Sequence, residues 1–465
     1  MAKRQTNLAK IVHPSSKITN QKRINLSQDR LSDLPDEILV SILSLLKLEE
    51  RQRTSILSRR WRYLWTFVTC NLVFDKSRLQ PVWEKYKCHE ISIADFRTAL
   101  YSERSKFIVW VNGVLELHQG DTIDEFRIFF DMDGTFSAVL DNWISFSRRK
   151  KVKKLSLNLL SLGRHKYSLT SQPFQSYSLE SLTDLSLTSV EVTGEVLDYI
   201  LSNCPFIEIL HVEISRSLMN LKTSCPLPKL KHLKIIYCQN LKHIQIHAIN
   251  LVSFKYFGCE TTRILLGDIP NFVSLSVMDS YVGYSFKNRC PISHYFSQLE
   301  TLELMILRFF RFPKLPKLRN LRLLKLDIHR LFMDGIPCCT SFLTASPMLQ
   351  RIVLKVTLIN LELFVGLNDP QMDGEINVWR DTCPHQCLKV VELIGFVGCF
   401  ADMQLALYLI NKATSLEKII VYTQRLSLGE ILHDSSYIKK KLAAATACAK
   451  KLETSLAPGV ELLIL

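Results

Sequence analysis

One short pattern of apolar residues recurs through most of the chain and limits the folds that it can adopt. An apolar residue is followed three positions later by a second and five positions later by a third, and this frame occurs twelve times in order. The frames begin at Ile123, Val152, Leu182, Ile207, Leu230, Leu251, Phe272, Leu299, Leu321, Leu349, Leu388 and Leu416. Successive starts lie 21 to 39 residues apart, so the sequence predicts a stack of short structural repeats.

Each repeat is expected to contribute one short parallel strand and an irregular or helical return. The inward side chains of one strand then stack on those of the next strand, and the returns cover the convex side. The stretch at 196–212 shows this organisation, because a helical apolar face ends before Pro205 and a new frame begins at Ile207. A single frame could arise by chance in a leucine-rich chain, but twelve in order indicate a repeat array.

A segment of three short helices is predicted ahead of the array, at residues 31–65. Pro35 fits the first position of a helix, and the two acidic residues that follow place negative charge in its first turn. Ser58 can cap another helix, which presents Trp61 on its apolar face. The segment has more apolar surface than roughly 40 residues can bury internally, so part of that surface should face a partner.

This helical segment resembles an F-box, the module by which substrate receptors dock on the Skp adaptor of cullin-based ubiquitin ligases. The resemblance is carried by two runs of residues: Leu31, Leu34, Pro35, Asp36, Glu37, Ile38 and Leu39, then Arg53, Thr54, Ser55, Leu57, Ser58, Arg59, Arg60, Trp61, Arg62, Leu64 and Trp65. The second run is typical of the large plant group. Arg51 departs from that group, which usually has a small apolar residue there, and the departure bears on the start of the second helix.

The resemblance implies which side chains meet the Skp-type adaptor. The expected docking anchors are Leu34, Pro35, Ile38, Leu39, Ile42, Leu57 and Trp61, whereas Leu43, Leu64 and Trp65 are expected to pack mainly inside the segment. Through the adaptor the chain would reach a cullin. The implied function is that of a non-catalytic substrate-recognition adaptor of an SCF-type (Skp-cullin-F-box) ubiquitin ligase, with the repeat array binding a target protein.

The array is similar to the leucine-rich repeats of plant F-box proteins, and its end resembles the FBD segment that closes many such arrays. The FBD resemblance is carried by Trp379, Cys387, Leu388, Val391, Glu392, Phe396, Gly398, Met403, Leu409, Leu416, Glu417 and Ile419. The expected fold is α/β, with a three-helix F-box, an irregular leucine-rich-repeat solenoid and a C-terminal FBD segment. The expected boundaries are a disordered basic tail at 1–28, the F-box at 29–75, the solenoid at 76–380 and the FBD-like segment at 381–465.

The frame also predicts which residues face solvent on the concave surface, because side chains alternate along a strand. The expected substrate-binding strip consists of an apolar ladder and two flanking lysines: Ile236, Phe257, Met278, Met305, Lys234 and Lys255. Exposed apolar strips usually mark binding surfaces. The alternatives are that a convex segment or the FBD covers the strip, or that the register is shifted by one residue.

The formal net charge of +15 suggests an acidic target. It also raises an alternative function, a basic repeat protein that binds nucleic acid or another anionic partner, which we regard as the weaker interpretation because much of the charge lies in residues 1–28 and 148–154. The run RRKKVKK at 148–154 can be a nuclear import signal or a phosphate-binding patch, but we prefer the solvated edge of a repeat.

The sequence FFDMDGTF at 129–136 raises a different chemistry. It resembles the motif of haloacid dehalogenase phosphatases, in which Asp131 would attack phosphorus and Asp133 would act as acid and base. That chemistry requires Mg²⁺ and further carboxylates downstream, and no suitable acidic pair follows. We therefore expect no catalytic residue.

The thirteen cysteines lack the regular spacing of a disulfide framework, and no secretory segment opens the sequence. Cys383, His385 and Cys387 lie close together, but no second pair at zinc-finger spacing accompanies them. No apolar run approaches the 18 or so residues of a membrane helix. We therefore expect reduced thiols, no metal or cofactor, no membrane partner, and a location in the nucleus or cytoplasm.

Overall fold

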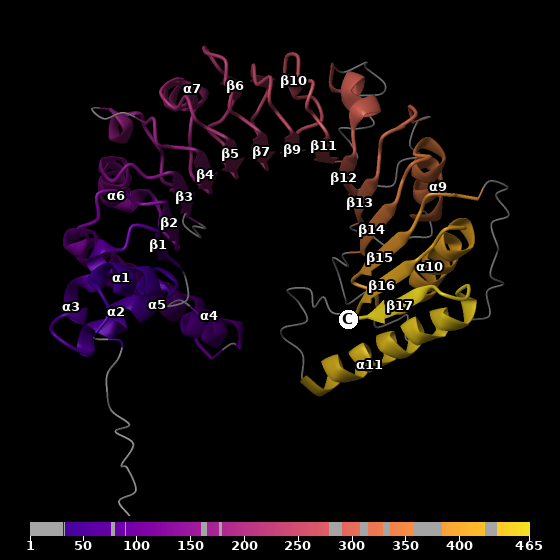
Figure 1. Ribbon diagram of the computed structural model, residues 1–465, viewed down its shortest axis with the longest axis horizontal. Helices are drawn as coiled ribbons and strands as arrows, with labels where there is room; N and C mark the ends of the chain where they lie inside the picture. The colour runs from indigo at the N-terminus through magenta and orange to yellow at the C-terminus, as the bar shows by residue number, and fades with distance from the viewer. Residues whose placement is uncertain are drawn as a thin grey trace, which may run out of the picture.

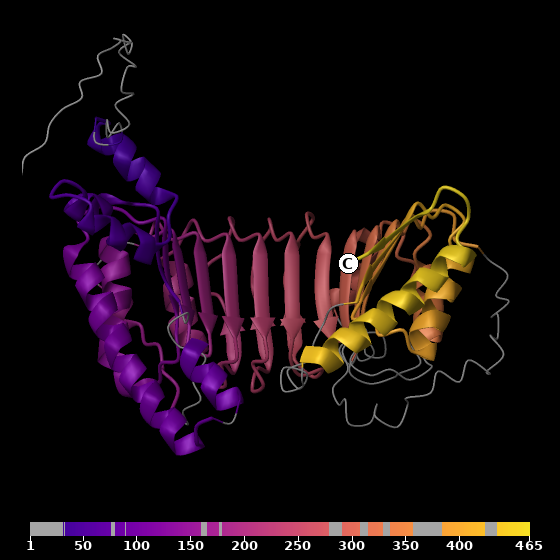
Figure 2. The ribbon, with the colours of Figure 1, turned by 90° about the horizontal axis from the view of Figure 1, so that it is seen from below.

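The computed structural model describes residues 31, 33–75, 80–88, 90–159, 165–175, 179–278, 291–306, 315–328, 335–356, 384–423 and 435–465. The basic tail predicted at residues 1–28 lies outside this part of the chain. The described residues form a horseshoe in which one curved parallel sheet lines the inner surface (Figure 1). Short helices of the N-terminal part lie at one end of the horseshoe, and the last helix lies at the other (Figure 2).

Fourteen of the described strands form this sheet, and neighbouring strands are parallel throughout. Their bounds are β1 Asn71–Phe74, β2 Glu125–Phe129, β3 Lys154–Asn158, β4 Asp184–Thr188, β5 Ile209–Glu213, β7 His232–Ile236, β9 Ser253–Phe257, β11 Ser274–Met278, β12 Thr301–Ile306, β13 Leu323–Ile328, β14 Arg351–Val356, β15 Val390–Ile394, β16 Lys418–Tyr422 and β17 Glu461–Ile464. The second and third residues of each predicted frame lie together on one strand, and the twelve frames occupy twelve successive strands of this sheet, from β2 to β16. The repeat prediction is confirmed.

The inward side chains of neighbouring strands stack in register along the sheet. Phe126 of β2 lies opposite Leu155 of β3, and Leu275 of β11 lies opposite Leu302 of β12. The residues at the second position of all twelve frames are at most 3% exposed. Full burial of one such side chain contributes about 1.5–3 kcal/mol, so this continuous column is a main source of stability.

The returns between strands build the outer surface. Helices there are α6 Ser137–Arg149, α7 Gly194–Ser202, α9 Gly335–Ala345 and α10 Phe400–Lys412, and α11 Ser435–Lys451 lies beside the last strand (Figure 1). Three further returns pair as a small second sheet, in the order β10-β8-β6, with bounds β6 Asn220–Lys222, β8 His243–Gln245 and β10 Arg263–Leu265. The frame does not predict this sheet, because each of these strands is three residues long and has one buried side chain, too little to show an alternating pattern.

The described chain opens with the three predicted short helices, α1 Asp36–Ser44, α2 Leu48–Arg53 and α3 Trp61–Leu64. Pro35 lies one residue before its predicted position, at the N-cap of α1. The hydroxyl oxygen of Ser58 accepts a 3.3 Å hydrogen bond from the backbone N–H of Trp61, as expected of a capping residue. The helical prediction is therefore correct to within a residue.

The helix α2 is regular although Arg51 lies within it. The Arg51 side chain is buried and donates hydrogen bonds to the carbonyl oxygens of Ser44 and Leu46, which end α1. Carbonyl oxygens at a helix end have no partner within the helix, so these hydrogen bonds help to satisfy them. Arg51 therefore stabilises the junction between the first two helices, and the expected difficulty at the start of α2 is absent.

A long helix joins this N-terminal part to the sheet. α5 spans Ile93–Leu117, and the shorter α4, Gln80–Lys87, lies beside it. The Phe107 ring of α5 stacks on Phe130 with centroids 3.8 Å apart and meets Phe74 of β1 edge-on at 6.5 Å. One contiguous apolar core results, which extends from α1 through all the repeats to the turn after α11.

Candidate functional site

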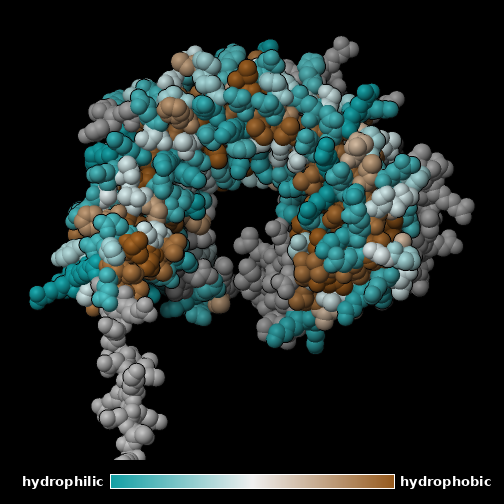
Figure 3. Space-filling model, in the orientation of Figure 1, coloured by the Kyte–Doolittle hydropathy of each residue, from teal (hydrophilic) through white to brown (hydrophobic). Residues whose placement is uncertain are grey.

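The three short helices expose several large apolar side chains. Of the predicted docking anchors, Ile38, Leu57 and Pro35 are exposed, while Leu34 and Ile42 are half-buried. Figure 3 shows an apolar patch over this N-terminal region. The other two predicted anchors, Leu39 and Trp61, are 0% and 7% exposed and lie in the core of the chain.

Leu43, Leu64 and Trp65 are buried, which confirms their predicted role in internal packing. Leu39 and Trp61 lie with them, so these two side chains hold the helices together in the free chain. A buried side chain contributes to docking mainly by keeping the surface residues in place. The apolar surface that is accessible to a partner is therefore formed by the exposed and half-buried members of the predicted set.

Two exposed apolar residues escape the sequence pattern. Leu45 is 85% exposed just after α1, and Ile56 is 87% exposed in the 3-10 turn Thr54–Ile56 that follows α2. Leu45 continues the helical spacing of Ile38 and Ile42 but lies just after the last residue of α1, and Ile56 lies beyond the end of α2. A large apolar residue just beyond the end of a helix is the signal that could have identified them.

Polar contacts fix the orientation of the short helices. The Arg60 guanidinium pairs with the Asp36 carboxylate at 2.6 Å and so joins α3 to the start of α1. The indole N–H of Trp110 on α5 donates a 2.8 Å hydrogen bond to the side-chain oxygen of Gln52 on α2. The exposed apolar surface is thereby held in a fixed position relative to the sheet.

The concave face of the sheet is the second candidate surface, and its register agrees with the prediction. Ile236 lies opposite Phe257, Met278 lies opposite Met305, and Lys234 lies opposite Lys255. We call the line through Lys234 and Lys255 the middle row and the line through Ile236 and Met305 the outer row. The one-residue shift considered for this face is excluded by the pairing.

Phe257 corrects part of the prediction, because it is 4% exposed rather than solvent-facing. The Lys255 ammonium lies 4.6 Å from the centroid of the Phe257 ring, and the Tyr237 ring lies 6.4 Å away. The cover therefore comes from side chains of the same face and does not require a convex segment or the FBD. Ile236, Met278 and Met305 are half-buried and keep part of their apolar surface accessible.

The middle row contains a partly buried ion pair. The Lys255 ammonium contacts the Glu303 carboxylate at 2.9 Å, and the Ser276 hydroxyl donates to the same carboxylate at 2.9 Å. Burial raises the pKa of Glu303, but the hydrogen bonds and positive charge of Lys255, with further help from Ser276 and Lys325, hold the net pKa below its ordinary value. Glu303 is therefore ionised at neutral pH.

Asp131 and Asp133 are engaged by one buried arginine. The Arg104 guanidinium pairs with both carboxylates, and its Nε donates to the Asp131 carbonyl oxygen at 2.9 Å. Burial raises the pKa of Asp133, but hydrogen bonds from Thr135 and the charge of Arg104 leave it below its ordinary value. Two carboxylates that neutralise an arginine are poorly placed to attack phosphorus or hold Mg²⁺, so the motif has a structural role here.

His385 also makes structural contacts with both ring nitrogens. Its Nδ1 accepts from the backbone N–H groups of Cys387 and Leu388 at 3.4 and 3.1 Å, so Nε2 donates to the Ser346 carbonyl oxygen at 2.9 Å. Cys383 lies outside the described residues. No group of three or more potential metal ligands occurs among the residues that the structure describes.

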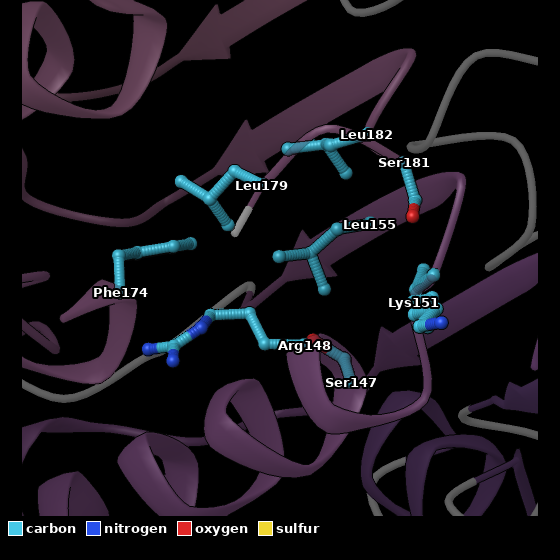
Figure 4. Close-up of a pocket in the computed structure, with 9 residues that line it drawn as sticks. Ser147, Arg148, Lys151, Leu155, Phe174, Leu179, Ser181 and Leu182 are labelled. Carbon is cyan, nitrogen blue, oxygen red and sulfur yellow. The ribbon is translucent and has the colours of Figure 1, made fainter. Parts of the chain in front are cut away.

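The basic run at 148–154 is divided between buried and exposed positions. Arg148 is buried at the end of α6, and Lys150 donates to the carbonyl oxygens of His118 and Gly120. Arg148 lines a small hollow with Leu155 and Phe174, and its side chain extends toward Phe174 (Figure 4). Lys153 pairs with the Asp124 carboxylate at 2.8 Å. The run is therefore not a continuous solvated edge, because several of its cations contact the protein itself.

Among the described residues, no helix is both long enough and apolar enough to span a membrane.

Comparison with known proteins identifies two families along the chain. Residues 31–71 match the F-box domain family, and residues 168–457 match the family described as "At1g61320/AtMIF1, LRR domain". The second match alone covers more than half of the chain, and it contains the repeats from β4 to β16.

Proteins of Arabidopsis thaliana are similar to the chain at moderate identity. The F-box/FBD/LRR-repeat protein At1g13570 is 30% identical over 270 residues, which covers 54% of each protein. The putative F-box/LRR-repeat protein At1g56400 is 30% identical over 267 residues, covering 54% of this chain and 51% of that protein. The chain spans about half the length of the curated relatives that it matches.

F-box domains generally bind Skp-type adaptors, and proteins that combine an F-box with leucine-rich repeats are generally non-catalytic adaptors for substrates. The exposed apolar helices and the parallel repeat sheet agree with the two matched families in kind and in order along the chain. On these grounds the chain belongs to the plant F-box/leucine-rich-repeat family, whose relatives include proteins with an FBD segment.

Proposed function

We propose that this protein is the substrate-recognition adaptor of an SCF-type ubiquitin ligase. Its F-box docks on a Skp-type adaptor, which connects it to a cullin, and its repeat array binds a target protein for ubiquitination. The observation that carries the proposal is an exposed apolar surface on three short helices that are fixed rigidly to a large concave sheet. A small helical unit exposes such a surface when a partner covers it.

The docking surface consists of the exposed and half-buried apolar residues of the F-box. We assign direct contact to Leu34, Pro35, Ile38, Ile42, Leu45, Ile56 and Leu57. Leu39 and Trp61 support these contacts from the core. The anchors of an interface typically lie near its centre, where water is excluded. The exposed side chains of this set would therefore lose their contact with water when the adaptor binds.

We place the boundaries of the F-box at 29–75, of the solenoid at 76–380 and of the FBD-like segment at 381–465. β15, β16 and β17 of the last segment continue the same sheet, which supports a solenoid completed by the FBD-like part. The helical returns α10 and α11 of this segment resemble the helical returns α6, α7 and α9 of the repeats before it.

The proposed protein performs no bond chemistry. It would raise the effective concentration of a bound target near the ubiquitin-charged enzyme on the cullin scaffold. A fixed geometry between the docking surface and the concave face suits this role, because it keeps the bound target close to the ubiquitin-charged enzyme. We place this activity in the nucleus, the cytoplasm or both, where cullin ligases act.

Co-purification tests the proposal directly. The full chain is co-expressed with a plant Skp-type adaptor and a cullin, and the complex is isolated through a tag on the chain. Wild type should retain both partners in stoichiometric amounts, and Leu34→Ala with Pro35→Ala should lose most of them. Met348→Ala, which changes an exposed apolar residue on the solenoid, is the matched control and should bind like wild type. Failure of wild type to form the complex would refute the proposed function.

A further inference from the structure

The middle row of the concave face carries more positive charge than its own acids neutralise. From β5 to β13 the row consists of His211, Lys234, Lys255, Ser276, Glu303 and Lys325, all aligned by strand register. Lys255 pairs with Glu303, whereas Lys234 and Lys325 are exposed and make no ion pair with any residue that the structure describes.

These two lysines leave positive charge on the face that no ion pair with a described residue compensates. Lys234 lies directly opposite Lys255 on the neighbouring strand, and like charges in that arrangement destabilise a sheet. Lys325 lies opposite Glu303, whose carboxylate is already engaged by Lys255 and Ser276. An anion bound at each lysine would compensate this positive charge, so the row is complementary to a partner with two separated acidic groups.

The outer row beside these lysines is apolar and bounded by acids. Ile236, Met278 and Met305 are half-buried, and the hydroxyl of Tyr237 lies 3.7 Å from the Met305 sulfur. Glu213 and Asp327 occupy the same row at either end. Tyrosine and methionine are enriched at the centres of protein interfaces, because they combine large contact area with adaptable packing.

We propose that this face binds an acidic peptide segment of the target protein, in which one apolar side chain lies between two carboxylates. The apolar side chain packs on Met278, Met305 and the Tyr237 ring, and the carboxylates pair with Lys234 and Lys325. The inference rests on the proposed function, since it names the class of substrate that the repeat array recognises.

Strand spacing sets the separation of the two acids. Lys234 and Lys325 lie four strands apart, which is about 19 Å at the usual spacing between neighbouring strands. An extended peptide advances about 3.4 Å per residue, so the carboxylates should be about five or six residues apart, with the apolar residue near the middle.

Nucleic acid fits this face less well. A phosphate backbone needs a continuous basic surface, whereas Glu213, Glu303 and Asp327 place negative charge among and beside the lysines. The apolar outer row would also remain uncovered by a polyphosphate. An acidic peptide satisfies the lysines and the apolar row together.

The test uses a display library of random 12-residue peptides, selected against the full chain purified with its Skp-type adaptor. Peptides with two acidic residues five or six positions apart around an apolar residue should be enriched. An enriched peptide, labelled with fluorescein, should bind at least tenfold more weakly to Lys234→Glu with Lys325→Glu. A peptide with lysines in place of its two acids should bind that variant better than it binds wild type.

The matched control is Lys229→Glu with Lys242→Glu, which makes the same change in net charge at exposed positions outside the two rows. It should change peptide affinity less than twofold, and both double variants should melt within a few degrees of wild type. The proposal is overturned if selection yields basic or uncharged peptides or none, if the control weakens binding equally, or if a single-stranded oligonucleotide binds more tightly than every enriched peptide. Loss of the Skp-type adaptor from wild type would refute the proposed function, which is scored separately on the same preparations.

Discussion

The Arg51 guanidinium donates a 2.9 Å hydrogen bond from Nη1 to the carbonyl oxygen of Asn71, the first residue of β1. Its Nε and Nη2 donate to the carbonyl oxygens of Leu46 and Ser44 at 2.8 and 3.3 Å. One side chain thus connects the end of α1, its own helix α2 and the first strand of the sheet. The residue that departs from the plant F-box pattern therefore attaches the short helices of the F-box to the sheet.

Arg51→Met should destabilise the protein by about 3 kcal/mol or more, because a buried charged side chain loses its hydrogen bonds to three backbone carbonyl oxygens. Hydrogen exchange measured by mass spectrometry should show faster exchange at the backbone N–H groups of α1 and β1. Arg53→Met changes an exposed arginine of the same helix and should leave exchange unaltered. Equal exchange in the two variants would contradict the role given to Arg51.

Substitutions at Trp61 and Leu57 should have different effects on stability and on docking. Trp61→Ala removes a buried side chain and should lower the free energy of unfolding by about 3 kcal/mol or more. Leu57→Asp changes an exposed side chain and should leave the melting temperature nearly unchanged while abolishing co-purification with the Skp-type adaptor. If Leu57→Asp retains the adaptor, the exposed F-box surface is not the docking surface.

The Asp133 carboxyl should make stability fall in acid. Because its pKa is held below the ordinary value of 3.8, the folded protein binds that proton more weakly than the unfolded chain does. The stabilisation is therefore complete above about pH 4 and is lost as the pH falls further. Asp133→Asn should lower the melting temperature at pH 7, and this difference from wild type should shrink below pH 3.8.

The control for this titration is Asp121→Asn, which changes an exposed carboxyl near the same strand. Its melting temperature should follow that of wild type at every pH. A difference between wild type and Asp133→Asn that stays constant from pH 7 to pH 3 would show that the charge of Asp133 does not stabilise the fold.

His385 should behave as a packing residue and not as a metal ligand. Both ring nitrogens are used in hydrogen bonds to the backbone, so neither has a lone pair available for zinc. His385→Ala should cost about 1–3 kcal/mol through the unsatisfied backbone groups. Treatment with EDTA should leave the melting temperature of wild type unchanged, and stoichiometric zinc in elemental analysis would contradict this assignment.

The interior strands of the sheet could be predicted from sequence, because each inward position must be apolar for neighbouring repeats to stack. The two terminal strands could not. Three residues before Leu72 of β1 stands Thr69, and three residues before Leu462 of β17 stands Gly459, so both lack the first residue of the frame. A terminal repeat has a neighbour on one side only, which relaxes the requirement for that residue.

The candidate surfaces were harder to predict, because exposure depends on contacts between distant parts of the chain. Phe257 is covered because Lys255 reaches across to Glu303, two strands further along the sheet. Spacing along one strand contains no information about that contact. Likewise, the exposure of Leu45 and Ile56 depends on where α1 and α2 end, which the apolar stripe specifies only to within a residue or two.

Among the described strands, β1 pairs only with β2, and on its other side the Asn71 carbonyl oxygen meets Arg51 of the F-box. The F-box is therefore also the end cap of the solenoid, and it shares one apolar core with the repeats. A mutation that loosens the first repeats would consequently abolish adaptor docking without altering any residue of the docking surface. Genetic lesions in the repeats and in the F-box should then produce the same phenotype, and an F-box transplanted from a relative would need to restore the arginine contact before it could function here.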